Sequence, residues 1–335
     1  MKIAVITSGG DASGVNAALY HLISREHEYI GYHSGFEGIV RNKPIPITQE
    51  DIEPVMHSGE LLIKSGRSDV LKTADGIEQV KAALKSQNVE VLVVFGGDGS
   101  AQGAKLLIAH GVNVIHIPMT IDNDIPGTDY TIGHKTAIEN VYHQIGHLKQ
   151  TGRNLEGRIF IVETFGGMSG QLTLAAGIAS GADIVLLPEY QMDIETIAQR
   201  ITELQEAGQQ TIIILCTESA FEPEQYNNGD QGVVAKISHL LEKKLKVRIR
   251  QSILGYTQRS GNPNIEDILL AGILGDFVKK SVLQHEFNFM AGMKKGIPVM
   301  LPLTVSGKGE APLLIQEFVE IAENKKLILG ERRNK

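Results

Sequence analysis

The sequence predicts a protein of the α/β class, in which helices cover both faces of mainly parallel sheets. Short and almost continuous apolar runs alternate along the chain with longer amphipathic segments. Strands that are buried on both faces have this uninterrupted apolar pattern, and helices usually connect parallel strands. Several apolar runs also end directly in glycine-rich or acidic segments, and open parallel sheets bind ligands beyond the carboxyl ends of their strands.

The expected elements follow from these two patterns. Buried strands are expected at Ile3–Thr7, Val89–Phe95, Val112–Ile117, Ile159–Thr164, Ile184–Leu187, Thr211–Cys216 and Gly296–Leu301. Helices are expected at Gly14–Ser24, Ile77–Ser86, Ser100–His110, His134–Leu148, Ser169–Ser180, Ile194–Ala207, Val233–Leu245, Ile265–Val282 and Leu313–Ala322. A new series of strands and helices begins after Gly133–Thr136, and we place a domain boundary there.

Length and composition exclude several classes of protein. The 335 residues suffice for one large or two moderate α/β domains, and 42% hydrophobic with 21% charged residues is typical of folded chains. The net charge is −7 and no long basic run is present, which argues against nucleic acid as a partner. No apolar stretch reaches the ~18 residues of a membrane span, so we expect no membrane partner and a cytoplasmic location.

The cysteine content and the first residues narrow the class further. The single cysteine, Cys216, excludes an internal disulfide framework and a cysteine-based metal site. Its apolar surroundings predict a buried strand position, with a reactive thiol as the alternative. Met1–Thr7 runs straight into a glycine turn and is interpreted as a first strand rather than a signal peptide.

The first glycine-rich segment, Thr7–Gly14 (TSGGDASG), joins the first strand to the first helix. Glycines let backbone N–H groups approach a phosphate, and a helix N-terminus adds partial positive charge. The segment has neither the ending of a P-loop nor the spacing of a dinucleotide fingerprint. It is therefore either a phosphate-binding loop or a plain tight turn.

The second segment, Gly96–Ser100 (GGDGS), follows a predicted strand and opens the next helix. Two glycines before a carboxylate suit a phosphate loop that also holds Mg²⁺, an ion that selects hard oxygen ligands. In the alternative, Asp98 or Ser100 simply caps the helix. Gly103 would let the start of this helix lie close to a nucleotide.

The third segment, Pro118–Asp129, contains two aspartates, Asp122 and Asp124. In an extended segment their side chains share one face, and like charges so close raise one pKa toward neutrality. One carboxylate can then accept a proton from a hydroxyl while the other binds substrate or tunes the first. A solvated acidic loop is the alternative for this segment alone. Together, the three segments supply the parts that phosphoryl transfer requires.

These motifs, in this order and spacing, resemble the ATP-dependent bacterial branch of the phosphofructokinase family. The resemblance extends to about Leu283 and is most specific at Thr120–Asp124 (TIDND) with Gly127–Gly133 (GTDYTIG), and at Leu254–Gly261 (LGYTQRSG). It implies two similar domains with mainly parallel, helix-covered sheets. Residues 1–134 and about 258–305 would bind the nucleotide, and residues 135–257 and about 306–335 would bind the sugar phosphate.

The resemblance also implies roles for individual residues. Asp122 would be the base that deprotonates the sugar 1-hydroxyl, supported by Thr120 and Asp124, and Asp98 would be the carboxylate associated with Mg²⁺. Arg67 would stabilise the transferring phosphoryl group, with an ordinary surface arginine as the alternative, and Lys72 stands where the family has a second arginine. ATP would contact Gly10, Arg67, Ser68, Gly97, Asp98, Gly99, Ser100 and Gly103.

For the sugar phosphate, the family pattern points to Arg158, Glu218, Arg250 and Arg259. Three guanidinium groups match the oxygens of one phosphate. In the family, Arg158 and Arg250 reach the site from a neighbouring subunit, which implies a homo-oligomer, either a tetramer or a dimer. Members that use pyrophosphate carry Asp at the position of Gly99 and Lys at the position of Met119, so Gly99 favours ATP as the donor.

The sequence departs from the family pattern in the sugar pocket. Phe165, Gly166 and Gly167 stand where the family has Met-Gly-Arg, and Tyr256 replaces the usual histidine. The acceptor is therefore either fructose 6-phosphate or another ketose phosphate or 6-sulfonate analogue. A non-catalytic sugar-phosphate sensor is a further alternative. NAD kinases and diacylglycerol-type lipid kinases share Gly-Gly-Asp-Gly but lack the Thr120–Asp124 stretch.

The effector site of the family also looks altered. It uses cations where this chain has Tyr20, Ser24, Gln150 and the pair Gln209-Gln210. A pocket without these cations attracts phosphorylated effectors poorly. We therefore expect weak or absent activation by nucleoside diphosphate and weak or absent inhibition by phosphoenolpyruvate.

Overall fold

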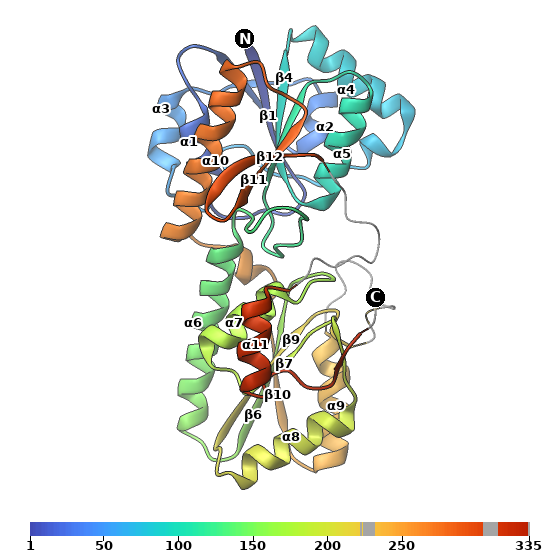
Figure 1. The fold of residues 1–335 in the computed structure, drawn as a ribbon, viewed down its shortest axis with the longest axis vertical. Helices are drawn as coiled ribbons and strands as arrows, with labels where there is room; N and C mark the ends of the chain where they lie inside the picture. Colours follow the sequence, from blue (N-terminus) through green and yellow to red (C-terminus); the bar gives the residue numbers. More distant parts are fainter. Residues whose placement is uncertain (222, 224–231, 304–313, 334–335) are drawn as a thin grey trace. The chain divides into compact units, whose positions relative to one another are not determined.

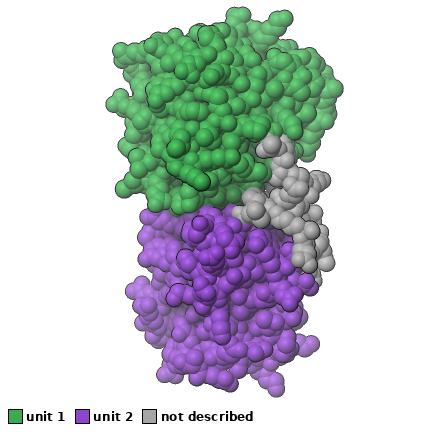
Figure 2. Space-filling model, viewed as in Figure 1, with its two compact units in different colours: residues 1–136, 259–308 green, residues 137–258, 309–335 purple. Residues whose placement is uncertain are grey.

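The computed structural model describes residues 1–221, 223, 232–303 and 314–333. The chain forms two compact units, coloured separately in Figure 2: residues 1–136 with 259–308, and residues 137–258 with 309–335. Each unit has a mainly parallel sheet covered by helices on both faces (Figure 1), which confirms the predicted fold class. The assignment of nucleotide and sugar phosphate to particular ranges stays a prediction. Within the described residues, no helix is both long and apolar enough to cross a bilayer.

The first unit contains a seven-stranded sheet in the order β12-β11-β5-β4-β1-β2-β3. Its central pairs are parallel, whereas β12 and β3 pair antiparallel with their neighbours at the two edges. The strands are β1 (Lys2–Ser8), β2 (Glu28–Tyr32), β3 (Ile45–Pro46), β4 (Val91–Gly96), β5 (Val114–Pro118), β11 (Phe289–Lys294) and β12 (Ile297–Leu301).

Helices cover both faces of this sheet. α1 (Val15–Leu22) and α10 (Ile265–Leu283) pack side by side on one face, and α2 (Gly35–Val40), α4 (Ala74–Ser86) and α5 (Asp98–Ala109) lie on the other (Figure 1). Polar side chains begin two of these helices. Thr73 accepts from the N–H of Gly76 at 3.1 Å, and Asn264 accepts from that of Asp267 at 2.9 Å. The short α3 (Gln49–Ile52) and two 3-10 helices, η1 (Glu53–Val55) and η2 (Val70–Lys72), also lie in the described part of this unit.

The second unit contains an all-parallel four-stranded sheet in the order β10-β6-β9-β7. α7 and α11 lie on one face and α8 and α9 on the other (Figure 1), while α6 continues into this unit from the first. A short antiparallel pair joins β8 and β13. The elements are α6 (His134–Arg153), β6 (Arg158–Thr164), α7 (Gln171–Ser180), β7 (Ile184–Leu186), β8 (Tyr190–Gln191), α8 (Ile194–Glu206), β9 (Thr211–Thr217), α9 (Val233–Leu245), β10 (Ile249–Ile253), α11 (Gln316–Asn324) and β13 (Glu331–Arg332).

Some local expectations are confirmed and others are wrong. Cys216 is fully buried in β9, and burial raises the pKa of its thiol, so nothing supports a reactive thiol. The strand predicted at Gly296–Leu301 exists, but it is an antiparallel edge strand and most of its residues are not buried. The sequence interpretation missed β2, β10 and β11, and also the short elements β3, β8, β13, α2 and α3. In β2, an added Cβ at Gly31 would lie 2.7 Å from Ile47, so close packing requires a glycine that weakens the strand pattern.

Candidate active site

Three loops of the first unit meet at the carboxyl ends of β1, β4 and β5. The hydroxyl of Ser100, after β4, donates to the carbonyl of Ser8 at the end of β1 (3.0 Å). The N–H of Met119, after β5, donates to the carbonyl of Gly96 (2.9 Å). An added Cβ on Gly97 would lie 3.5 Å from the Cβ of Thr120. The phosphate-loop candidates and the aspartate-bearing loop therefore form one site, as parallel neighbouring strands allow.

A cation from a distant part of the sequence joins this site. An added Cβ on Gly10 would overlap with Nη1 of Arg259, so the guanidinium lies directly over the first glycine loop. The same group lies 3.9 Å from the carboxylate of Asp11 and is mostly shielded from solvent. A larger residue at position 10 would therefore require the arginine side chain to move.

The segment after Lys64 forms the other side of the first loop. The N–H of Gly9 donates to the carbonyl of Gly66 at 3.1 Å, and the hydroxyl of Ser65 donates to the carbonyl of Gly9, also at 3.1 Å. Arg67 is exposed beside this contact. The hydroxyl of Ser68 accepts from the N–H of Val70 at 3.2 Å. Another expected cation, Lys72, is paired with Asp69 at 2.7 Å on the surface.

The loop that carries Asp122 and Asp124 is turned rather than extended. Asn123 between them adopts a left-handed conformation with φ of 52°, so the extended geometry assumed from the sequence is wrong. The side chain of Asn123 stabilises this turn: its Oδ1 accepts from the N–H of Thr131 (2.9 Å), and its Nδ2 donates to the carbonyl of Asp129 (3.1 Å). The hydroxyl of Thr120 accepts from the N–H of Asp122 at 3.2 Å.

The two aspartates still interact as a pair. Burial raises the pKa of Asp122, while the positive charges of Arg259 and Arg67 oppose this rise. Burial, followed by repulsion from Asp122, raises the pKa of Asp124 to about 7, and Asp98 adds a smaller repulsion. The arginines thus favour the ionised form of Asp122 against the effect of burial, and burial together with the charge of Asp122 keeps a proton on Asp124 up to near-neutral pH.

The carboxylates of this site could supply part of the coordination of Mg²⁺. Among the described residues, no three His, Cys, Asp or Glu side chains form a cluster that could hold a metal. Mg²⁺ usually needs only one or two carboxylates, because substrate phosphates and water complete its coordination. Oδ1 of Asp122 and Oδ1 of Asp124 are buried and accept no hydrogen bond from the described residues. Together with Asp98, these oxygens are donors of the type that Mg²⁺ prefers.

The remaining residues of the second loop are placed as follows. Neither Asp98 nor Ser100 caps α5: the N-cap is Gly97 without a side-chain bond, and Ser100 instead contacts β1. The capping alternative is therefore wrong. Asp98 accepts from the amide of Gln102 at 2.8 Å. Gly99 is exposed, with no atom within 4 Å of an added Cβ. At Gly103, an added Cβ would lie 2.8 Å from Leu71 and 2.9 Å from Phe36, so side chains already occupy that space.

In the second unit, the predicted sugar residues divide between the two ends of the sheet. Phe165, Gly166 and Gly167 follow the carboxyl end of β6, where Glu218 follows β9 and accepts from the N–H of Gly167 at 3.1 Å. The ring of Phe165 packs edge-on against Tyr256 at a centroid distance of 5.6 Å. An added Cβ on Gly166 (φ 153°) would overlap with the carbonyl of Ser169, so this position requires glycine.

The two arginines predicted to come from a neighbouring subunit lie toward the opposite end. Arg158 is the first residue of β6, and Arg250 lies at the second position of β10, paired in register with Phe160. The parallel register puts both arginine side chains on one face of the sheet. The seven residues of β6 separate Arg158 from Phe165 by roughly 20 Å at ~3.3 Å per residue. Within one chain, Arg158 therefore does not reach the Phe165–Gly167 loop.

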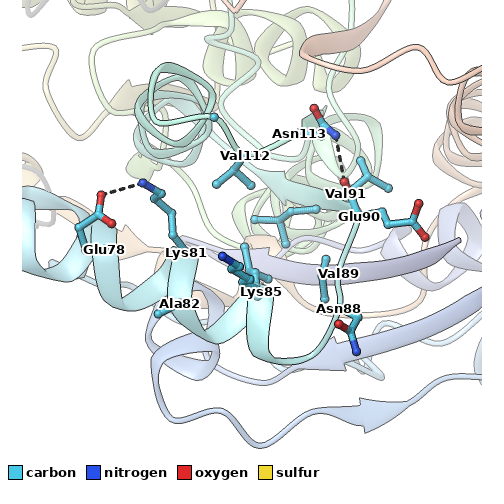
Figure 3. Close-up of a pocket in the computed structure, with 13 residues that line it drawn as sticks. Glu78, Lys81, Ala82, Lys85, Asn88, Val89, Glu90, Val91, Val112 and Asn113 are labelled. Atoms are coloured by element: carbon cyan, nitrogen blue, oxygen red, sulfur yellow. Dashed lines mark hydrogen bonds and ion pairs between the residues drawn. The ribbon is translucent and has the colours of Figure 1, made fainter.

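A separate cavity of about 740 Å³ lies at the amino-terminal edge of the first sheet (Figure 3). Its wall combines the end of α4 with the starts of β4 and β5. Lys81 is paired with Glu78 at 2.8 Å, and the amide of Asn113 donates to the carbonyl of Glu90 at 3.1 Å. None of the predicted site residues lines this cavity, so it is not part of the candidate active site.

Comparison with known proteins identifies the family to which the chain is similar. The model of the Phosphofructokinase family matches residues 2–280. The chain is 34% identical over 314 residues to the ATP-dependent 6-phosphofructokinase of Persephonella marina, covering 91% of this chain and 93% of that protein. It is 33% identical over 307 residues to ATP-dependent 6-phosphofructokinase 1 of Thermus thermophilus, with coverages of 90% and 92%.

A solved structure extends the comparison to the fold. The phosphofructokinase of Pichia pastoris in the T-state superimposes with a TM-score of 0.84 at 25% identity. The match covers 97% of this chain but only 37% of the other, so the chain spans little more than a third of that protein.

Proposed function

Because the chain belongs to the phosphofructokinase family, we propose that it is an ATP-dependent 6-phosphofructokinase of glycolysis. It transfers the γ-phosphoryl group of Mg-ATP to the 1-hydroxyl of fructose 6-phosphate. The observation that carries this proposal is the convergence of two glycine loops with Asp122 and Asp124 in the first unit. Phosphoryl transfer depends on such positioning and on electrostatic stabilisation.

In the proposed mechanism, Asp122 is the general base. Arg259 and Arg67 favour its ionised form, and the N–H of Asp122 is anchored on the Thr120 hydroxyl. The carboxylate accepts the proton of the 1-hydroxyl as this oxygen attacks the γ-phosphorus and the bond to ADP breaks. Thr120 and Asp124 orient the sugar and shape the charge, and Arg67 stabilises the phosphoryl group.

The nucleotide binds along the two glycine loops. Gly10, Gly97, Gly99 and Ser100 border the ATP phosphates, with Ser68 and Gly103 at the same nucleotide site. Asp98, with the oxygens of Asp122 and Asp124 nearby, would hold Mg²⁺, which neutralises charge on the phosphates when bound. The open space beside Gly99 supports ATP over a pyrophosphate donor, because an aspartate there would face the phosphates.

For contacts with the sugar phosphate, the family pattern assigns Thr120, Asp122 and Arg259, and it also assigns Phe165, Gly166, Gly167, Glu218 and Tyr256. The lack of a cationic side chain at Phe165, Gly167 and Tyr256 supports an alternative acceptor, another ketose 6-phosphate or a 6-sulfonate analogue. Turnover should be measured with Mg-ATP and a panel of ketose phosphates and sulfonates. Absence of ADP release with every acceptor would favour the non-catalytic sensor.

We also propose a homo-oligomer, a tetramer or dimer, that works in the cytoplasm, where ATP and sugar phosphates occur. The separation of Arg158 from the Phe165 loop supports delivery of Arg158 and Arg250 by a neighbouring subunit. An apolar stripe on α10 supports it too, since Ile265 (75%), Leu269 (61%) and Ile273 (42%) are exposed. A protein that is monomeric by light scattering and fully active in the assay would contradict this assembly.

A further inference from the structure

Asp267 is a buried carboxylate that none of the proposed catalytic steps uses. It lies in the first turn of α10 and is fully inaccessible to solvent. Its Oδ1 accepts from the N–H of Gly133 at 2.9 Å. Its Oδ2 accepts from the N–H and the hydroxyl of Thr136, at 2.7 and 2.6 Å. The side chain of Asp267 thereby accepts from N–H groups at the start of α6 that lack a partner within that helix. Asp267 itself belongs to α10, more than 100 residues later in the chain.

These hydrogen bonds stabilise the residues that adjoin the catalytic loop. Ile132, directly before Gly133, donates to the carbonyl of Pro118 (3.0 Å) and accepts from the N–H of Thr120 (3.2 Å). His134, directly after Gly133, is buried, and its Nδ1 lies 2.7 Å from the carbonyl of Ile121. Ile132 and His134 therefore hold the loop immediately before Asp122, and both adjoin Gly133, which is hydrogen-bonded to Asp267.

Asp267 and the residues around Gly133 also pack against the first glycine loop. An added Cβ at Gly14 would lie 3.0 Å from Ile132 and 3.7 Å from the Cβ of Asp267. At Gly133 (φ 98°), an added Cβ would overlap with Ala12. Displacement of Gly133 would consequently disturb both the aspartate-bearing loop and the turn that leads into α1.

We propose that Asp267, acting through Gly133 and Thr136, is a positioning residue that keeps Thr120, Asp122 and Asp124 in their reactive places. The proposal rests on the proposed kinase activity of the same site. Asp267 touches neither substrate nor reacting atoms in this role. Its contribution is the geometry of the loop, and a displacement of about 1 Å can lower a rate by ~10²-fold.

The test compares isosteric variants of the full chain. In Asp267→Asn the amide nitrogen cannot accept from Thr136, so kcat should fall about 10–100-fold while KM for Mg-ATP changes little. The matched control is Asp183→Asn, because Asp183 is a half-buried carboxylate that accepts from the N–H of Ile213 (2.8 Å) in the second unit. This control should lose comparable thermal stability and keep its kcat.

Two further variants cover the case in which Asp267→Asn does not fold. Thr136→Val removes the hydroxyl that donates to Oδ2 of Asp267 and accepts from the N–H of Asn264 at 3.1 Å. Loss of the buried bond to Asp267 should lower kcat about 3–10-fold, whereas Thr136→Ser keeps the hydroxyl and should restore kcat. Wild-type kcat in Thr136→Val, or in folded Asp267→Asn, would overturn the positioning role. A kcat loss in Asp183→Asn equal to that in Asp267→Asn would overturn it as well. Absence of turnover in the wild-type chain would instead refute the kinase activity itself.

Discussion

The carboxyl edges of the two sheets differ in the kind of group that they present. In the first unit this edge combines three loops, three aspartates and two arginines that act on one another electrostatically. In the second unit it presents the neutral Phe165–Gly167 loop, tied to Glu218, while Arg158 and Arg250 lie toward the other end. The first edge thus presents several ionisable groups that lie close together. The second edge presents an uncharged loop with one nearby carboxylate.

The largest effect should follow from loss of the proposed base. Asp122→Asn should lower kcat by about 10²–10⁴-fold, the usual contribution of a general base. ADP release from Mg-ATP and fructose 6-phosphate measures it. Asp75→Asn, the same change at an exposed position in α4, serves as the control and should behave as wild type. Unchanged turnover of the Asp122 variant would remove the chemistry from the first unit.

A smaller but still large effect is expected at Gly99. Gly99→Asp should fold normally, because the space around an added side chain is open. Its charge would face the ATP phosphates, and like-charge contacts cost several kcal/mol, so kcat/KM for Mg-ATP should fall by ~10²-fold or more. Gly146→Asp on α6, where the space is equally open, is the matched control. Assays with ATP and with pyrophosphate would show whether donor selection belongs to this loop.

The second unit should control the choice of acceptor. Gly167 has φ of 57°, a conformation that other residues adopt at a cost of about 1–2 kcal/mol, so Gly167→Arg remains feasible. A charged hydrogen bond from this arginine should raise the preference for a 6-phosphate over a 6-sulfonate by ~10-fold. The ratio of the two kcat/KM values measures it. An unchanged ratio would mean that the Phe165–Gly167 loop does not contact the charged end of the sugar.

The raised pKa of Asp124 predicts a pH-dependent loss of stability in the first unit. The ordinary value is 3.8 and the folded value about 7, so between these pH values the folded protein keeps a proton that the unfolded chain releases. Stability therefore falls as pH rises from ~4 to ~7. Asp124→Asn should remove this loss and raise Tm at pH 8 by about 2–4 °C, with little change at pH 4. An equal Tm difference at both pH values would contradict this origin.

The smallest effect should come from effectors. Tyr20, Ser24, Gln150, Gln209 and Gln210 supply no positive charge where the family uses cations. Nucleoside diphosphate and phosphoenolpyruvate should therefore shift the apparent affinity for the sugar phosphate little or not at all. Titration of either compound against activity tests this. A large shift would show that other cations of the chain form an effector pocket.

Much of this architecture could be predicted from the sequence because it depends on local patterns. Apolar runs and amphipathic periods predicted the parallel sheets, the helices and the buried position of Cys216. The same patterns placed Gly96–Ser100 and Thr120–Asp124 at strand ends. The sequence alone thus determined the α/β class and which loops carry the acidic residues, since neighbouring residues encode both.

Other features were decided only by tertiary structure. The left-handed Asn123 depends on Thr131 and Asp129, the guanidinium of Arg259 lies over Gly10, and Asp267 anchors Gly133. Partners so far apart in sequence leave no periodic pattern between them, so composition and spacing did not reveal these contacts. Spacing also could not show that Arg259 and Arg67 oppose the rise in the pKa of Asp122, whereas Asp122 and Asp98 add to the rise in the pKa of Asp124. This difference depends on where the folded chain places the two arginines.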